Sequence, residues 1–325
     1  MTTLRLSMSA YKQVQPRVNF QGAAINKKPF FRRKDKVVFV VGPTGTGKSR
    51  LAIDMATRFP AEVVNCDKMQ VYKGLDIVTN KVTEEECRGV PHHLLGTVDP
   101  DTNFTSDDFR NHASLVLESI VTRDRLPIIA GGSNSYVEAL TNEDPNFRLR
   151  YECCFLWVDV SIPVLHSFVS DRVDRMVKAG LIDEVRNMFD PNRDDYSQGI
   201  RRAIGVPELD QYFRKEATAD ASTRDKLLDA AIGKIKENTC MLACRQLQKI
   251  RRLHSQWDWN MHRIDATEVF LRSGGEAEEA WEKLVAGPSA MILNQFLYDT
   301  VSQPDVTIIG REVPIPIPAM AAAYR

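Results

Sequence analysis

Two groups of residues in this chain could handle phosphates and protons: a glycine-rich segment at residues 42–49 and an aspartate at position 67. The segment reads GPTGTGKS and fits the pattern G-x-x-x-x-G-K-[ST]. In this pattern glycines permit a tight turn, and successive backbone N–H groups point at an anion. We therefore expect a diphosphate to be bound by Gly42, Pro43, Thr44, Gly45, Thr46, Gly47, Lys48 and Ser49, with the Ser49 hydroxyl as a ligand of a Mg²⁺ cofactor.

The residues on either side of this segment predict the elements that hold it. Residues 37–41 are an unbroken apolar run of strand length, and residues 49–59 carry apolar side chains at helical spacing. A buried strand thus leads into a glycine turn that opens a helix, whose N-terminal amides and dipole favour an anion. Such a loop indicates a bound diphosphate and does not by itself indicate ATP hydrolysis.

Further strands and helices alternate along the chain. We expect strands at 61–67, 126–132, 154–160 and 261–267, and a helix at 105–122 that opens with Thr-Ser-Asp-Asp. This alternation predicts an α/β fold with a P-loop NTPase-like parallel sheet flanked by helices. Such sheets bind ligands at the carboxyl ends of their strands.

Asp67 stands at one of these strand ends, near the expected phosphate site. Its carboxylate could hold Mg²⁺ through water, accept a proton from a nucleophile, or cap the turn. Spacing alone leaves the three roles open.

The chain divides by composition into five parts. Residues 1–36 form a basic N-terminal segment, 37–162 the α/β core with the phosphate loop, and 163–258 a mostly helical portion that forms a lid over the site. A C-terminal strand and helices occupy 259–310, and a Pro-rich tail at 311–325 is expected to be loose.

The basic N-terminal segment is the main indication of where in the cell the protein is located. Residues 1–36 hold nine Lys or Arg and a single acid, Asp35, which leaves 34 basic and 42 acidic residues in the remainder of the 325-residue chain. A basic, acid-poor segment with Ser and Thr and no apolar core is typical of an organelle transit peptide, and an ordinary basic tail is the alternative. No run approaches the roughly 18 apolar residues of a membrane helix, so we expect no membrane partner.

Cysteines and histidines do not form a recognisable metal site. The six cysteines lack a C-x-x-C pair and histidines at zinc spacing, so we interpret them as thiols in a reducing compartment. For the adjacent pair His92 and His93 we expect a local structural role, because neighbouring residues on one segment rarely chelate together.

Two general classes of P-loop protein compete at this point. A nucleotide kinase would use the loop, an acid at position 67 and an arginine-bearing lid, for which Arg172 and Arg175 are spaced i, i+3 on one helical face. Their alternative role is in a salt-bridged helix with Asp171 and Asp174. A nucleotide switch is disfavoured because the N-K-x-D guanine-reading motif is absent.

The sequence around Asp67 favours a third class of P-loop protein. The stretch NCDKMQVYKGLDIVTNK (65–81) resembles the D-S-x-Q-V-Y-[KR]-G-x-D-I-x-T-x-K signature of the isopentenyltransferases, which transfer a dimethylallyl group to the N6 amine of adenine. Further blocks look like that family's, in the same order: PHHLL (91–95), FTSDDFR (104–110), PIIAGGSNSY (127–136), RVDRMVKAGLIDEV (172–185), QGIRRAIGVPEL (198–209) and LACRQLQKIRRL (242–253). The resemblance spans about residues 37–265.

Within that family the chain resembles the plant-type adenylate branch more than the tRNA branch. The tRNA enzymes carry a helical insertion after the G-G-[ST]-x-x-Y block, whereas here only eighteen residues separate Tyr136 from the strand FLWVDV. A C-terminal zinc finger is also absent, and the acidic core argues against a nucleic-acid partner. The resemblance implies transfer from dimethylallyl diphosphate to ADP or ATP, with AMP as a further acceptor, and a plastid location, or otherwise a cytoplasmic one. We expect a monomer that does not act on tRNA.

The resemblance also implies roles for single residues. Asp67 is the expected general base, while Thr46, Lys48 and Arg202 act on the leaving diphosphate, with Lys73 as a further contact and Arg201 as the alternative to Arg202. We expect Asp67, Arg110, Ser133 and Tyr136 to contact the acceptor nucleotide. Candidates for its outer phosphates are Lys178, Lys215, Lys234 and Lys236.

Overall fold

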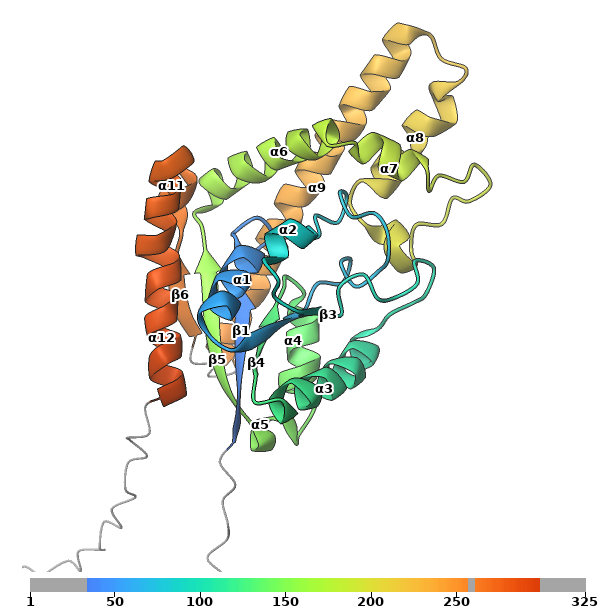
Figure 1. Ribbon diagram of the computed structural model, residues 1–325. Helices are drawn as coiled ribbons and strands as arrows, with labels where there is room; N and C mark the ends of the chain where they lie inside the picture. The colour runs from blue at the N-terminus through green and yellow to red at the C-terminus, as the bar shows by residue number, and fades with distance from the viewer. Residues whose placement is uncertain (1–33, 257–260, 299–325) are drawn as a thin grey trace, which may run out of the picture. The chain divides into compact units, whose positions relative to one another are not determined.

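The computed structural model describes residues 34–256 and 261–298 (Figure 1). Most of the expected transit segment and the whole tail at 311–325 lie outside these residues. The centre is a six-stranded sheet in which every neighbouring pair of strands is parallel, in the order β3-β2-β4-β1-β5-β6. The strands are β1 (Asp35–Val41), β2 (Ala61–Asn65), β3 (His92–His93), β4 (Leu126–Ala130), β5 (Tyr151–Asp159) and β6 (Met261–Asp265).

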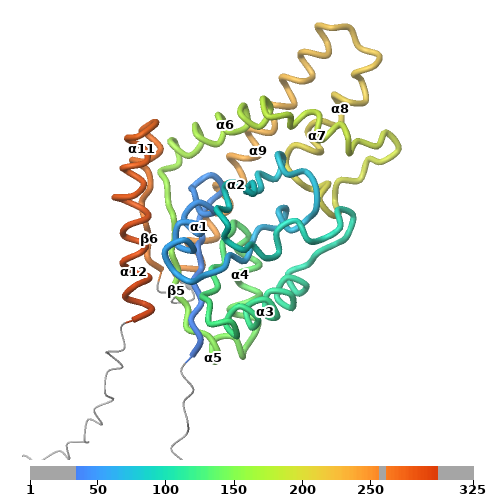
Figure 2. The backbone as a smooth tube through the Cα atoms, viewed as in Figure 1, coloured from blue at the N-terminus to red at the C-terminus, as the bar shows by residue number. Residues whose placement is uncertain are grey.

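Helices connect and cover the strands, as Figures 1 and 2 show. They are α1 (Lys48–Arg58), α2 (Glu84–Cys87), α3 (Ser106–Thr122), α4 (Asn134–Thr141), α5 (Phe147–Arg150), α6 (Ile162–Lys178), α7 (Leu181–Arg186), α8 (Val206–Glu216), α9 (Ala221–Gln256), α10 (Thr267–Phe270), α11 (Gly274–Trp281) and α12 (Gly287–Tyr298), with a 3₁₀ turn η1 (Gly199–Arg202) and a π-helical turn η2 (Glu282–Ala286).

The sheet is apolar on both faces because both faces are covered. In β1, Val37, Phe39 and Val41 belong to one hydrophobic cluster, which also takes in side chains of α3, α4, α8 and α9. The alternate residues Val38 and Val40 belong to a second cluster with side chains of α1, α6, α11 and α12. A strand buried on both sides needs a continuous apolar run, which is why these segments could be found in the sequence.

The predicted elements are present with small shifts at their ends. All five expected strands occur, and β1 begins at Asp35, two residues before the expected start of the core. The helix expected at 105–122 begins after Thr105, whose hydroxyl and Asp108 form a capping box. The short edge strand β3 was not predicted, because two residues give no periodic signal.

The C-terminal helices continue past a proline. The chain is helical in α11 and again in α12, which extends to Tyr298 although Pro288 is its second residue. Residues 282–286 form a π-turn, in which the Gly287 N–H donates to Glu282 O. Proline lacks an N–H and breaks the normal α-helical bonding, and the wider turn accommodates that loss.

The carboxyl ends of β1, β2 and β4 open toward the helical portion, where α6 and the long helix α9 lie (Figure 1). The predicted mostly helical C-terminal part is therefore confirmed. Among the described residues no helix is both long enough and apolar enough to cross a membrane.

Candidate active site

One large pocket lies at the carboxyl end of the sheet. Its volume is about 1710 Å³, and it is lined by the phosphate loop, the tips of β2 and β4, and the facing sides of α6 and α9. Single-ligand pockets commonly measure about 300–1,000 Å³. The cavity is thus large enough for two substrates.

The phosphate loop contributes one wall of this pocket. Thr44, Gly45, Gly47, Lys48 and Ser49 line it, with Lys48 and Ser49 in the first turn of α1. The Lys48 ammonium donates to Pro43 O at 2.6 Å. Burial lowers the pKa of Lys48 to about 8, partly offset by the negative charge of Asp67 and reinforced by the positive charge of Arg172. The lysine still carries its proton at neutral pH.

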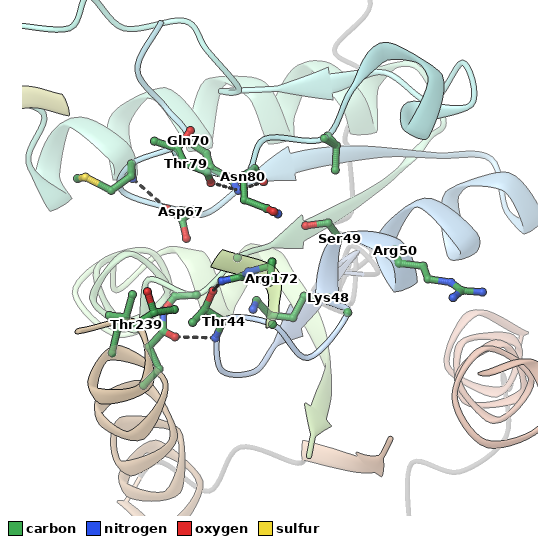
Figure 3. A pocket seen from close by; sticks show the side chains of 18 of the residues that line it. Thr44, Lys48, Ser49, Arg50, Asp67, Gln70, Thr79, Asn80, Arg172 and Thr239 are labelled. Carbon is green, nitrogen blue, oxygen red and sulfur yellow. Dashed lines mark hydrogen bonds between the residues drawn. The ribbon is translucent and has the colours of Figure 1, made fainter. Parts of the chain in front are cut away.

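Asp67 projects into the pocket from the tip of β2, opposite Lys48 and Arg172 (Figure 3). Its Oδ1 accepts a hydrogen bond from the Met69 N–H at 2.9 Å, which fixes the orientation of the carboxylate. A Cβ built on Gly132 would lie 3.6 Å from Oδ2, so that oxygen faces the space above the β4 turn. The geometry suits a carboxylate that receives a proton from a bound group.

Gly132 keeps the space between Asp67 and the loop open. A Cβ at this position would come within 2.4 Å of the Gln246 amide nitrogen, so a side chain would displace Gln246 as well as narrow the pocket. The glycine turn after β4, which the sequence marked as a strand end, therefore leaves room for a reacting group between the proton acceptor and the phosphate loop.

Arg172 of α6 lies against the phosphate loop. Its guanidinium donates to the Thr44 hydroxyl at 3.1 Å, while its buried Nε has no hydrogen-bond partner among the described residues. Burial, and next the neighbouring positive charge of Arg175, lower the pKa of Arg172 to about 10. A half-buried arginine with an unpaired donor beside a phosphate loop suits the binding of an anion. The alternative of a salt-bridged helix is not seen here, since Asp174 pairs with Lys236 at 2.7 Å instead.

Gln246 of α9 joins two loops of the site. Its side-chain oxygen accepts from the Thr44 N–H at 2.7 Å, and its nitrogen donates to Gly132 O at 2.9 Å. The Asn134 amide donates back to Gln246 O at 3.1 Å. The loops after β1 and β4 are thereby fixed to the same turn of α9. The Thr44 amide, expected to face the diphosphate, is occupied by Gln246.

A second group of positively charged side chains lines the pocket around Lys68. Arg202 lines the pocket, donating to Gly199 O at 3.2 Å and to the Tyr72 hydroxyl at 3.3 Å. Burial lowers the pKa of Lys68, and so do the nearby charges of Lys249 and Arg202. These positive charges repel one another, so an anionic ligand bound between them would be stabilised.

The structure places Arg202, and not the alternative Arg201, on the pocket wall. Arg201 turns away, with its side chain 3.5 Å from the Asp101 carboxylate. Ser133 also lines the pocket, and its hydroxyl accepts from the Lys68 N–H at 2.9 Å. For these two residues the structure agrees with the expected location, while their roles stay predictions.

Six other residues of the expected diphosphate and acceptor sites do not line the described pocket. Lys73 pairs with Asp99 at 2.7 Å on the exposed side of its turn, and Arg110 pairs with Asp107 at 3.0 Å. Neither side chain lines the described pocket. Both were chosen from their sequence blocks, and nothing in a block states the direction of a side chain.

Tyr136 and Thr46 are fully buried beneath the pocket. The Tyr136 hydroxyl donates to Phe104 O at 3.3 Å, and its ring lies 5.2 Å from the Lys68 ammonium, so it supports the pocket wall from behind. The Thr46 hydroxyl donates to Pro43 O at 3.0 Å and stabilises the loop internally. Gly42 and Pro43 likewise lie outside the pocket lining.

The basic face of α9 was missed by sequence reasoning. Arg245, Lys249 and Arg252 line the pocket and follow the helical spacing i, i+4, i+7. Lys178, Lys215, Lys234 and Lys236 do not line it. The long helix has charges on most of its surface, so its sequence alone gave no way to choose among them.

Comparisons with known proteins identify the family of this chain. The family model described as IPP transferase matches residues 70–148 and 140–253, more than half of the chain. The chain is 69% identical over 294 residues to adenylate isopentenyltransferase 5, chloroplastic, of Arabidopsis thaliana, covering 89% of each chain. It is 56% identical over 298 residues to adenylate isopentenyltransferase 7, mitochondrial, of the same plant, covering 90% of each.

A solved structure shows the same fold. A eukaryotic dimethylallyltransferase acting on tRNA superimposes with a TM-score of 0.69 at 23% identity, over 84% of this chain and 82% of that one. With the family match and the two plant relatives, this similarity confirms the P-loop NTPase-like sheet and the resemblance found in the sequence. The chain belongs to the IPP transferase family.

Proposed function

We propose that this protein transfers the dimethylallyl group of dimethylallyl diphosphate to the N6 amine of ADP or ATP, with AMP as a further acceptor, and so begins cytokinin biosynthesis. The two plant relatives are named adenylate isopentenyltransferases. The observation that carries the proposal is the placement of Asp67 across one pocket from Lys48 and the phosphate loop.

Asp67 supplies the base in this reaction. The adenine N6 amine is a weak nucleophile because its lone pair is delocalised into the ring, so proton removal assists attack on C1 of the prenyl group. As the N6–C1 bond forms, the bond from C1 to the diphosphate oxygen breaks, and Oδ2 of Asp67 takes the N6 proton. General-base assistance of this kind contributes about 10²–10⁴-fold.

The opposite wall stabilises the leaving group. Negative charge gathers on the departing diphosphate, where the Lys48 ammonium, Arg172 and the first amides of α1 lie close to one another. Arg202, which lines the same pocket, supplies a further positive charge. Fixed donors in a partly buried site act more strongly than donors in water.

A magnesium ion fits this pocket if a protein hydroxyl and the substrate's phosphates hold it together. No group of three or more His, Cys, Asp or Glu side chains among the described residues could enclose a metal. Ser49 lines the pocket beside Lys48, and Mg²⁺ is often held by one or two protein oxygens together with substrate phosphates. When bound there, Mg²⁺ would neutralise charge on the diphosphate.

The acceptor nucleotide occupies the remainder of the pocket in this proposal. Its adenine lies near Asp67 and Ser133, and its phosphates extend along Arg245, Lys249 and Arg252 of α9. The proposal excludes tRNA as the main acceptor, because the stretch between Tyr136 and β5 holds only the rest of α4 and the short helix α5. We also propose that the protein acts as a monomer in a plastid.

The test is incubation of purified protein with dimethylallyl diphosphate, Mg²⁺ and, separately, AMP, ADP, ATP or unmodified tRNA, followed by mass analysis. We expect an added prenyl group on ADP and ATP. Preferential modification of tRNA would move the protein to the other branch of its family. Release of orthophosphate from ATP, or phosphorylation of AMP, would support a kinase instead.

A further inference from the structure

Helix α11, near the C-terminal end of the described chain, contacts the phosphate loop. The Trp281 side chain is 3% exposed, and a Cβ added to Gly47 would lie 2.8 Å from two of its ring carbons. Gly47 has φ of 88°, a left-handed conformation that favours glycine. The indole therefore packs directly against the loop backbone at the residue before Lys48.

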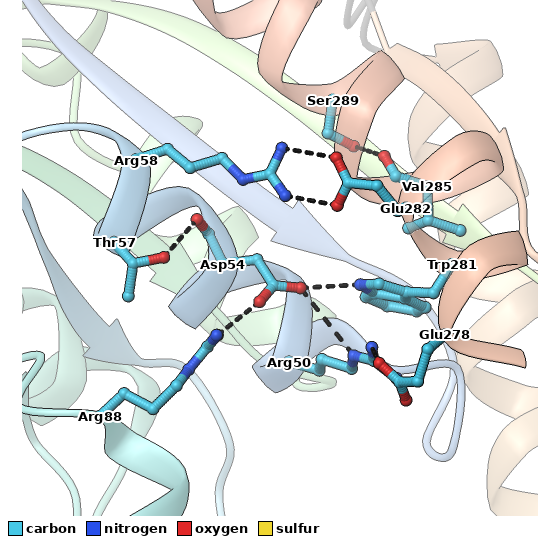
Figure 4. A network of polar contacts seen from close by, with 10 residues as sticks. All are labelled: Arg50, Asp54, Thr57, Arg58, Arg88, Glu278, Trp281, Glu282, Val285 and Ser289. Carbon is cyan, nitrogen blue, oxygen red and sulfur yellow. Dashed lines mark hydrogen bonds and ion pairs between the residues drawn. The ribbon is translucent and has the colours of Figure 1, made fainter. Parts of the chain in front are cut away.

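The indole is held in place by a buried carboxylate on α1 (Figure 4). Trp281 Nε1 donates to Asp54 at 2.7 Å, and Asp54 is 8% exposed. Arg88, which ends the short helix α2, pairs with the same carboxylate. Asp54 thus connects three segments around the loop, namely α1, α2 and α11.

Arg50 provides a second contact between α11 and the loop. Its guanidinium lies 4.4 Å from the centre of the Trp281 ring, and it donates to Glu278 on the same face of α11, with one distance of 3.1 Å. Trp281 therefore contacts residues on both sides of the Lys48–Ser49 pair, namely Gly47 before it and Arg50 after it.

We propose that Trp281 is a positioning residue for the donor's diphosphate. It holds the turn from Gly47 to Arg50 in the conformation that directs the Lys48 ammonium and the first amides of α1 into the pocket. This inference rests on the proposed function for the identity of the anion, but it concerns the loop alone. Trp281 is also part of the pocket lining.

The test compares binding of two ligands to folded protein. Inorganic pyrophosphate with Mg²⁺ reports on the loop, and ADP reports on the acceptor side, each measured by titration calorimetry. We expect Trp281→Ala to weaken pyrophosphate binding by about tenfold or more while ADP binding changes by less than about twofold, since small displacements of a fixed site are costly. Trp281→Phe, which keeps a flat ring against Gly47, should recover most of the loss.

A matched control comes from the opposite end of α1. Arg58, the last residue of α1, pairs with Glu282, the first residue of η2, at 2.5 and 3.0 Å, away from the loop. Glu282→Gln should leave both affinities unchanged. Trp281→Leu keeps an apolar side chain in the core, so it tests the same expectation if the alanine variant does not fold, as judged by thermal melting.

The outcomes of this experiment distinguish the positioning role of Trp281 from the proposed prenyl transfer. Pyrophosphate binding that is unchanged in the Trp281 variants, or that weakens in equal proportion to ADP binding, would overturn the positioning role. If the wild type fails to prenylate any nucleotide while Trp281→Leu selectively loses pyrophosphate affinity, the proposed function fails and the positioning role stands.

Discussion

At the scale of single residues, Lys48 and Asp67 share one pocket but depend on different supports. Lys48 is buried and donates to a backbone carbonyl of its own loop. Asp67 is oriented by the backbone of the turn that follows it. The proposed chemistry needs the lysine charged, which its bond to Pro43 O favours, and the carboxylate held in the pocket, which the Met69 N–H favours.

Replacement of Asp67 tests the base role. Asp67→Asn keeps the size of the side chain but cannot accept the N6 proton, so we expect kcat to fall by about 10²–10⁴-fold. Pyrophosphate binding should be largely retained. Asp99→Asn, an exposed acid that pairs with Lys73, is the control and should behave as wild type. Residual turnover close to that of the control would remove Asp67 from the base role.

The pKa of Lys48 predicts how donor binding depends on pH. Burial places this pKa near 8, and only the protonated form attracts the diphosphate. The KM for dimethylallyl diphosphate should therefore be constant below about pH 8 and rise above it, as the lysine loses its proton. In Asp67→Asn the rise should begin at lower pH, because the charge of Asp67 raises the pKa of Lys48. A KM that is flat to pH 10 in both proteins would contradict this assignment.

At the scale of elements, α9 completes a site that the sheet begins. Loops after parallel strands meet at one edge of a sheet, but nothing in the strands fixes one loop to the next. Gln246 does so by bonding to the loop after β1 and to the loop after β4. The basic face of the same helix extends the pocket away from the loop.

Removal of the Gln246 side chain should weaken the binding of both substrates. Gln246→Ala leaves the Thr44 N–H and Gly132 O without their partner, and each buried unsatisfied group costs about 1–3 kcal/mol. We expect a lower melting temperature and a raised KM for donor and acceptor alike. Arg251→Ala, on the exposed side of α9, is the control for a change in helix charge. A rise in KM for only one substrate would show that the two loops are not coupled through Gln246.

At the scale of the whole molecule, the charge of the chain is divided between its parts. Residues 1–36 carry a basic excess, whereas residues 37–325 carry an acidic excess. The names of the two plant relatives state different compartments, chloroplastic for one and mitochondrial for the other. Family membership therefore does not determine the compartment.

The N-terminal segment can be tested apart from the enzyme. Residues 1–36 fused to a fluorescent protein should direct it to plastids in plant cells, because a basic, acid-poor segment with hydroxyl residues is typical of a transit peptide. Replacing several of its Lys and Arg residues by Gln should leave the fusion in the cytoplasm. Accumulation in mitochondria would contradict the plastid proposal, and a diffuse signal from the unmodified segment would indicate an ordinary basic tail.

The sequence by itself determined the phosphate loop, the strands and the position of Asp67 at a strand end. These features depend on local patterns: glycine spacing sets the turn, and apolar runs set the buried strands. The ordered blocks added the family, which the comparisons confirmed.

Only the tertiary structure decided which side chains share the pocket. Lys73, Arg110 and Tyr136 belong to the right blocks but point elsewhere, whereas Gln246 and Trp281 reach the loop from about 200 residues or more further along the chain. Side-chain direction depends on the packing of α9 and α11 against the sheet. Such contacts between distant segments leave no periodic or spacing signal in the sequence.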